Sequence, residues 1–126
     1  MFEVTVEQTF AAGHALREYK GKCENVHGHN YRVQITVEGE KLNRIGLLVD
    51  FVELKKAVRE VIERLDHQFI NDLEPFTTIN PSAENMAKYF YDEVTRRLDI
   101  TQGEAPSRVS QIKVWETDTS IAVYRP

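Results

Sequence analysis

The sequence has a single cysteine, no long apolar run and no excess of positive charge. One cysteine cannot form a disulfide within the chain, which fits a reducing environment. No apolar run approaches the ~20 residues that a membrane-spanning helix needs. With 16 basic and 20 acidic residues, a net charge of −4, sequence-independent binding to nucleic acid or anionic membrane is a poor first hypothesis. Any anionic ligand must therefore be held by a local cluster.

Features that would divide the chain into parts are also missing. The sequence shows no internal repeat, low-complexity tract or linker, and 126 residues with 41% hydrophobic content suit one domain, residues 1–126. Met1 leads directly into alternating residues, not into a basic segment followed by an apolar run. We therefore expect a single cytoplasmic domain.

Strand-like and helix-like patterns follow one another along the chain. Apolar and polar residues alternate over residues 2–10 and again over residues 29–38, which predicts two long strands, the second antiparallel to the first. A helical spacing of apolar residues then begins after Asp50, which stands three residues before Glu53 as in a capping box. A second such spacing begins at Asn80 or Ser82. These two segments predict amphipathic helices.

Two closing strands are expected in RVSQIKVWE and SIAVYR, which makes the element order ββααββ. This order predicts an α+β domain, a four-stranded antiparallel sheet with two helices on one face. In the third strand, Val109 and Trp115 are expected on the face opposite Ile112 and Val114, so that both faces are apolar. Association of subunits is the simplest cover for the second face.

Histidines are placed where the predicted strands meet. His27 and His29 are two residues apart at the start of a strand and project from one face, and His14 ends the strand before it. If the two strands pair, the three imidazoles converge in a set that suits zinc with an open coordination position. Alternatively, the His-x-His pair is simply polar surface on a solvated strand.

A second group of residues has the chemistry of proton transfer. Cys23 lies in a polar loop four residues before His27, and a thiol near a divalent cation loses its proton more easily. His67 follows Asp66 after the first helix. Acid, imidazole and thiol are the parts of a proton relay. The alternatives are a small buried cysteine and a histidine that complements a helix C-terminus, and adjacency alone does not show that Asp66 contacts His67.

One carboxylate and several basic residues are candidates for contact with a substrate. Glu116 ends the third strand among apolar neighbours and could accept two hydrogen bonds from an amino-pyrimidine edge, although most strand-end glutamates are simply solvated. Arg17, Lys20 and Lys22 lie near the cysteine loop, but exposed basic loop residues are common, so we assign them no role.

The motifs FAAGH, CENVHGHNY, LVDFVELK, RLDHQFIN, NPSAEN and VWET, in this order and at these spacings, resemble the 6-pyruvoyl-tetrahydropterin synthase and 6-carboxytetrahydropterin synthase family. The resemblance runs from residue 2 to residue 125 and implies the tunnelling fold, in which three subunits join their sheets into a barrel and two trimers stack into a hexamer. It also implies active sites that are shared between subunits. The implied roles are zinc ligation by His14, His27 and His29, proton transfer by Cys23, Asp66 and His67, and pterin anchoring by Glu116.

The implied activity is that of a zinc-dependent lyase. Its expected substrate is 7,8-dihydroneopterin triphosphate, converted to 6-carboxy-5,6,7,8-tetrahydropterin with release of acetaldehyde and triphosphate, a step of queuosine biosynthesis. The loop favours this branch because Cys23 stands three residues before the HGH motif. Formation of 6-pyruvoyl-tetrahydropterin stays open, and Glu24 also matches relatives that make 6-hydroxymethyl-7,8-dihydropterin. A zinc hydrolase and a metal-stabilised oligomer without catalysis stay open as well.

Overall fold

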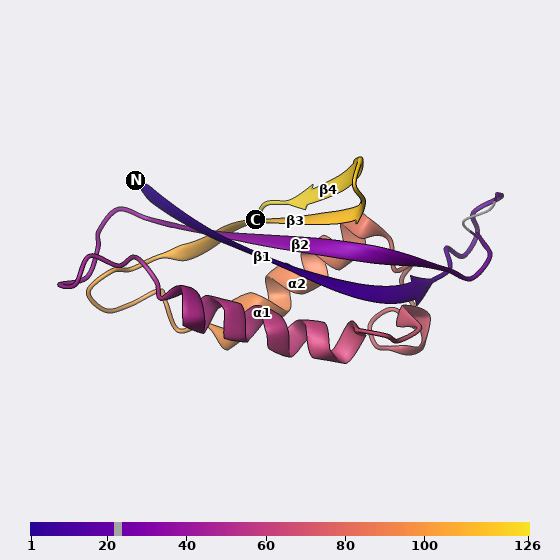
Figure 1. Cartoon of the computed structure of the whole chain (residues 1–126), viewed down its shortest axis with the longest axis horizontal. Coiled ribbons are helices and arrows are strands. Elements are labelled where there is room, and N and C mark those ends of the chain that lie inside the picture. The colour runs from indigo at the N-terminus through magenta and orange to yellow at the C-terminus, as the bar shows by residue number, and fades with distance from the viewer. Residues whose placement is uncertain (22–23) are drawn as a thin grey trace.

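A four-stranded antiparallel sheet forms one layer of the structure, and two helices packed on one of its faces form the other (Figure 1). The computed structural model describes residues 1–21 and 24–126. Its elements are β1 (Phe2–His14), β2 (His27–Gly39), α1 (Phe51–Leu65), the 3-10 helix η2 (Ile70–Asp72), α2 (Ala83–Arg97), β3 (Arg108–Thr117) and β4 (Ser120–Tyr124). The strands are ordered β1-β2-β3-β4. The predicted α+β class and the ββααββ order are confirmed.

Both helices begin at side-chain caps that the sequence contains. The Asp50 carboxylate accepts a hydrogen bond from the Val52 amide at 2.8 Å, and the Ser82 hydroxyl accepts one from the Asn85 amide at 3.1 Å. Each bond satisfies an amide that the first turn of a helix leaves unpaired. Ser82, not Asn80, is therefore the residue at which the second helix starts. The apolar stripes then face the sheet, with Leu54, Val58, Val61, Leu65, Met86, Phe90 and Val94 all buried.

A register shift in the sheet corrects one prediction about the third strand. Ile112 pairs with Ile35, whereas Val109 pairs with Val37, so β3 holds one residue more than β2 over this stretch. Such a bulge moves the next side chain to the other face. Val109 is consequently buried under the helices with Ile112, and only Trp115 of the predicted apolar pair lies on the uncovered face.

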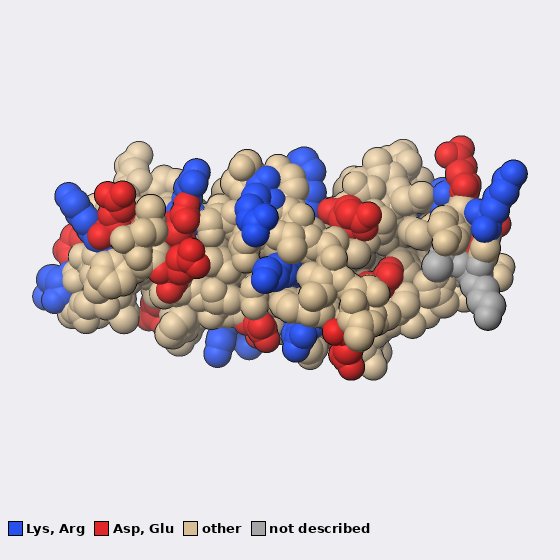
Figure 2. Space-filling view, turned by 90° about the horizontal axis from the view of Figure 1, so that it is seen from above, with Lys and Arg blue, Asp and Glu red and all other residues tan. Residues whose placement is uncertain are grey.

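The uncovered face of the sheet is mostly polar. The guanidinium of Arg32 lies 4.1 Å over the Trp115 ring, a cation–π contact between β2 and β3. On the face seen from above, basic and acidic side chains of the described residues are interspersed along the length of the molecule (Figure 2). None of the helices in this part of the chain is long and apolar enough to cross a membrane.

Candidate active site

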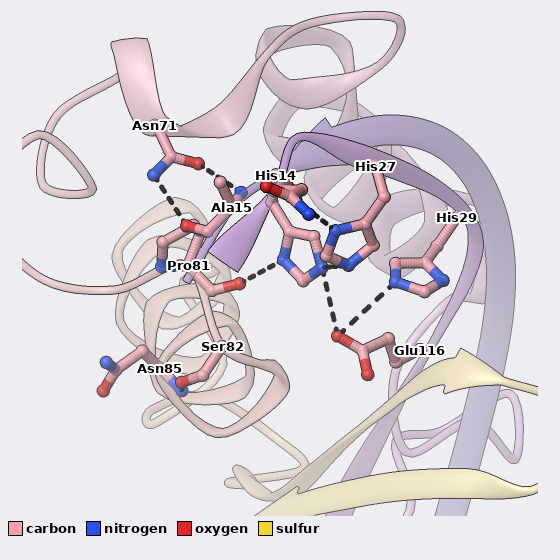
Figure 3. Close-up of polar contacts among 10 residues, drawn as sticks. His14, Ala15, His27, His29, Asn71, Pro81, Ser82, Asn85 and Glu116 are labelled. Carbon is pink, nitrogen blue, oxygen red and sulfur yellow. Dashed lines mark hydrogen bonds and ion pairs between the residues drawn. The ribbon is translucent and has the colours of Figure 1, made fainter. Parts of the chain in front are cut away.

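The pairing of the first two strands brings three histidines together at one end of the sheet. The register places His14 opposite His27 and Ala12 opposite His29. One ligand nitrogen from each ring lies within 4.8 Å of the others, and Figure 3 shows the three rings turned toward a common point. The convergence that the sequence predicts is therefore present in the structure.

Backbone carbonyls fix which nitrogen of two rings faces the cluster. His14 Nδ1 lies 2.7 Å from the Pro81 carbonyl oxygen, and His27 Nδ1 lies 2.7 Å from that of Asn25. A carbonyl only accepts, so each neutral ring carries its proton on Nδ1 and leaves Nε2 bare. The two Nε2 atoms are 2.9 Å apart. Two lone pairs at this distance repel unless a proton or a metal cation lies between them.

Burial keeps two of these rings neutral. Desolvation lowers the pKa of His14, although the Pro81 carbonyl and the charge of Glu116 act in the opposite direction. The pKa of His29 is lowered for the same principal reason, again opposed by Glu116. Neutral imidazoles are the form that binds metal ions. Both rings are thus ready for a metal over a wider pH range than a solvated histidine.

The residues fit a bound divalent cation. His29 Nε2 is buried and has no hydrogen-bond partner among residues 1–21 and 24–126, which is uncommon for a buried polar atom. Together with the bare Nε2 atoms of His14 and His27, it completes a set of three nitrogen donors. Three neutral imidazoles are the donor set of an open zinc site. These three histidines could therefore hold a metal ion.

Glu116 reaches the histidine cluster from β3. Its Oε1 lies 3.3 Å from the bare His14 Nε2 and 3.8 Å from His29 Nε2, so a proton or cation held between the rings would also be attracted by this carboxylate (Figure 3). The side chain is 28% exposed, so it is not the fully solvated strand-end glutamate of the alternative interpretation. Glu116 consequently borders both the metal position and the solvent from which a substrate would enter.

The segment after α1 pairs with the outer edge of β1. The His67 amide donates to the Ala11 carbonyl at 2.6 Å, and the Gly13 amide donates to the Gln68 carbonyl at 3.0 Å. A parallel bridge between Gly13 and Phe69 continues this pairing. His67 itself has φ +59°, the left-handed region that non-glycine residues rarely adopt and that is enriched at functional sites. The pairing holds His67 beside the strand that ends in a cluster histidine.

Asp66 orients the His67 ring. His67 Nδ1 lies 3.0 Å from Asp66 Oδ1, and the same oxygen accepts the Ala11 amide at 3.0 Å. The Ala11 hydrogen bond is the largest cause that lowers the pKa of the Asp66 carboxyl, and His67 lowers it further. The contact that adjacency could not show is thus present. Because Nδ1 faces the carboxylate, Nε2 is the nitrogen left free for proton transfer.

One surface hollow is lined by a histidine of the cluster and by His67. A cavity of about 420 Å³ has His29 and His67 in its lining. Cys23 lies outside the described residues, so its predicted place in a loop beside the metal stays a prediction. Glu24 is described and exposed, and its amide donates to the Gly21 carbonyl at 3.2 Å. The larger hollow of about 570 Å³ lies at the opposite end of the sheet, near Met1, and contains no histidine.

Several residues near the site were missed by the sequence analysis. A hollow beside Glu116 is also lined by Glu84, which lies in the first turn of α2. In the sequence, Glu84 stood out only as an acidic residue that follows a helix cap. Tyr31 is fully buried, with its ring 5.6 Å from that of His29, and its hydroxyl has no partner within the described ranges. Burial, and secondarily the charge of Glu116, raises the pKa of Tyr31 and keeps it a neutral phenol.

Comparisons with known proteins agree with this arrangement. The family model described as 6-pyruvoyl tetrahydropterin synthase matches residues 3–126. The chain is 42% identical over 130 residues to the 6-carboxy-5,6,7,8-tetrahydropterin synthase of Bacillus subtilis (strain 168), a match that covers 99% of this chain and 86% of the relative. It is 36% identical to the 6-pyruvoyl tetrahydrobiopterin synthase of Drosophila melanogaster, with 97% of this chain and 78% of that protein covered.

Among solved structures, the 6-pyruvoyl tetrahydropterin synthase of Caenorhabditis elegans superposes with a TM-score of 0.84 at 28% identity, and the match covers 100% of this chain and 97% of that one. The family match extends over nearly the whole chain, and it includes both the histidine cluster and the Asp66–His67 pair. This chain therefore belongs to the 6-pyruvoyl tetrahydropterin synthase family.

Proposed function

We propose that the protein is a zinc-dependent 6-carboxy-5,6,7,8-tetrahydropterin synthase. Its substrate is 7,8-dihydroneopterin triphosphate, and acetaldehyde and triphosphate are released with the product, in the route to queuosine. The single observation that carries the proposal is the pair of facing bare Nε2 atoms of His14 and His27, 2.9 Å apart, which calls for a cation. The similarity to the Bacillus subtilis enzyme favours this pterin product over the others.

The histidine cluster and Glu116 have binding roles in this proposal. His14, His27 and His29 hold zinc, and bound zinc supplies a Lewis acid that stabilises negative charge on substrate oxygens. Glu116 anchors the pterin by accepting hydrogen bonds from its amino-pyrimidine edge. Its carboxylate lies beside the cluster, so an anchored ring would present its side chain to the metal position.

Proton transfer is assigned to the second group. Cys23 takes the carbon-bound proton of the substrate side chain as general base. His67 returns or removes protons through Nε2, since Asp66 occupies its Nδ1 side. The lining of one hollow by His29 and His67 supports the assignment of both groups to the same reaction.

The working unit in this proposal is an oligomer, a trimer or a dimer of trimers in the cytoplasm. The His67 side chain is 80% exposed, and water-exposed groups transfer protons less selectively than enclosed ones. The outer edge of β4 and the part of β1 not covered by residues 66–69 are available for pairing with neighbouring subunits. Closure of a barrel by these edges would enclose the site.

Product identification tests the proposal. Zinc-loaded protein is incubated with 7,8-dihydroneopterin triphosphate, and the released pterin is identified by mass. A 6-carboxy product supports the proposal, and a pterin at unchanged ring reduction level that keeps its whole side chain supports a hydrolase. The His29→Ala variant is the matched control for traces of copurified enzyme. If the fully zinc-loaded oligomer converts no substrate, the remaining interpretation is a metal-stabilised oligomer without catalysis.

A second candidate product depends on Glu24. Its carboxylate is exposed in the loop that precedes the HGH motif, so it can act as acid or base in place of the thiol. Such a protein releases 6-hydroxymethyl-7,8-dihydropterin. Cys23→Ala and Glu24→Gln separate the two. Loss of the carboxylated product in the first variant and loss of the hydroxymethyl product in the second would show two activities in one chain.

A further inference from the structure

The chain that follows His14 leaves the sheet and is held by side chains from a distant loop. Asn71 is buried and bonds both backbone groups of Ala15. Its Oδ1 accepts the Ala15 amide at 2.9 Å, and its Nδ2 donates to the Ala15 carbonyl at 2.8 Å (Figure 3). An amide side chain in this pose replaces the strand that would otherwise continue the ladder. The residue next to a cluster histidine is thus fixed at two points.

Asn80 repeats the arrangement two residues later. Its Oδ1 accepts the Arg17 amide at 2.8 Å, and its Nδ2 donates to the Arg17 carbonyl at 3.0 Å. The Arg17 guanidinium in turn donates to the Phe76 carbonyl at 2.8 Å and to the Ile79 carbonyl at 3.2 Å. Residues 15–17 and 71–80 therefore form one hydrogen-bonded unit. These bonds account for the position of Arg17 without a role in phosphate binding.

The hydrogen-bonded unit of residues 15–17 and 71–80 lies next to the Pro81 carbonyl, which orients His14. Asn80 immediately precedes Pro81, whose carbonyl accepts the proton on His14 Nδ1 at 2.7 Å. Asn85 Nδ2 donates to the Asn80 carbonyl at 2.9 Å and ties the same peptide to α2. Because proline has no amide hydrogen, the backbone of this turn has one hydrogen bond fewer to hold it. The side chain of Asn80 supplies the missing restraint.

We propose that Asn71 and Asn80 are positioning residues that hold the His14 ring with its proton on Nδ1 and its bare Nε2 toward the metal position. The proposal rests on the proposed metal site, and it concerns what prepares one ligand for the ion. Partners of the non-ligating nitrogen fix the tautomer of metal-binding histidines, and their removal costs about 10- to 100-fold in metal affinity.

Asn43 provides a control for a merely structural role. Its Oδ1 accepts the amides of Ile45 and Leu47, both at 3.0 Å, in the loop that follows β2 at the end of the sheet remote from the histidines. Asn43→Ala therefore also removes two hydrogen bonds between an asparagine and a loop backbone. It thus removes the same number of hydrogen bonds without touching the unit around His14.

The experiment compares Asn71→Ala, Asn80→Ala and Asn43→Ala with the unaltered chain. Zinc affinity is measured by competition with a chromophoric chelator, and the tautomer of His14 by ¹⁵N NMR of the metal-free protein. Because the direct partner of His14 Nδ1 is the Pro81 carbonyl, we expect zinc affinity to fall in the first two variants by at most about 10- to 100-fold, and to stay unchanged in Asn43→Ala. We also expect His14 to become a mixture of tautomers only in the first two. Asn71→Ser and Asn80→Ser replace an alanine variant that does not fold.

Two outcomes overturn the proposal. One is a His14 that keeps its proton on Nδ1 in both variants, and the other is an affinity loss as large in Asn43→Ala as in Asn80→Ala. Failure of the unaltered chain to bind zinc would instead refute the proposed function. The tautomer measurement needs no metal, so it would still decide whether Asn71 and Asn80 position the ring.

Discussion

His14 of the histidine cluster and His67 lie at the same end of the sheet in opposite surroundings. The His14 side chain is 1% exposed, its Nδ1 is bonded to a buried carbonyl, and desolvation lowers its pKa. The His67 side chain is 80% exposed and is held by a single carboxylate on the edge of β1. The first environment suits a ligand that must stay neutral, and the second suits a group that must exchange protons.

The contrast between His14 and His67 shows which parts of the site a single chain forms by itself. Pairing of β1 with β2 and the turn at Pro81 assemble the cluster within the chain. The Asp66–His67 pair is oriented by the chain but open to solvent. This difference fits the proposed site shared between subunits, in which the metal position would form before assembly and proton transfer would wait for enclosure.

The largest expected effect comes from removing a histidine of the buried cluster. His29→Ala removes one of the three nitrogen donors, the partly exposed one, and leaves His14 and His27 in place. Turnover should fall by more than the ~10² to 10⁴-fold that a proton-transfer group supplies, because charge stabilisation at the metal is lost as well. Metal content after dialysis, measured by mass spectrometry, should drop in parallel. Retention of one tightly bound zinc per chain would contradict the assignment.

Removal of the exposed His67 ring should lower turnover without affecting metal binding. His67→Ala removes the ring whose Nε2 is free, and turnover should fall about 10² to 10⁴-fold. Zinc content and thermal stability should match those of the unaltered protein, because the exposed ring packs against little. A variant that loses zinc as well would show that the two groups are not independent.

Acidification should sharpen the difference between buried and exposed rings. The unfolded chain takes up protons on His14 and His29 near pH 6.5, while the folded, metal-free chain does so only at lower pH. Between these values the unfolded state binds more protons, so the free energy of unfolding decreases as the pH falls. Urea titrations of metal-free protein at about pH 7.5 and about pH 5.5 measure the change. Equal midpoints would contradict the lowered pKa values.

The smallest expected effect concerns Tyr31, whose buried ring lies beside that of His29. Tyr31→Phe removes a buried hydroxyl that has no partner within residues 1–21 and 24–126. Its desolvation is uncompensated, so the metal-free variant should unfold with a free energy equal to or about 1 kcal/mol above that of the unaltered chain. Urea denaturation tests this. A clear loss of stability would reveal a hydrogen bond made by this hydroxyl in solution.

Alternation, helix spacing and caps were sufficient to predict the elements and their order. They failed at Val109, because a bulge depends on how two strands fit and leaves no signal in either strand alone. The roles of the site residues, including Cys23 and Glu24, stay predictions. For His14, the sequence placed the ring near the other two histidines, but it did not reveal the Pro81 carbonyl or the asparagines around it, because residues 14 and 81 meet only in three dimensions.

The sequence by itself determined the parts of this protein, namely two long strands, two capped helices and histidines at strand ends, because periodicity and capping are local properties. Tertiary structure alone decided what those parts can do. It set the tautomers of His14 and His27 through carbonyls, turned Asp66 toward His67, and left one ring buried and another open. These outcomes depend on burial and on contacts between distant residues, and neither exists until the chain has folded.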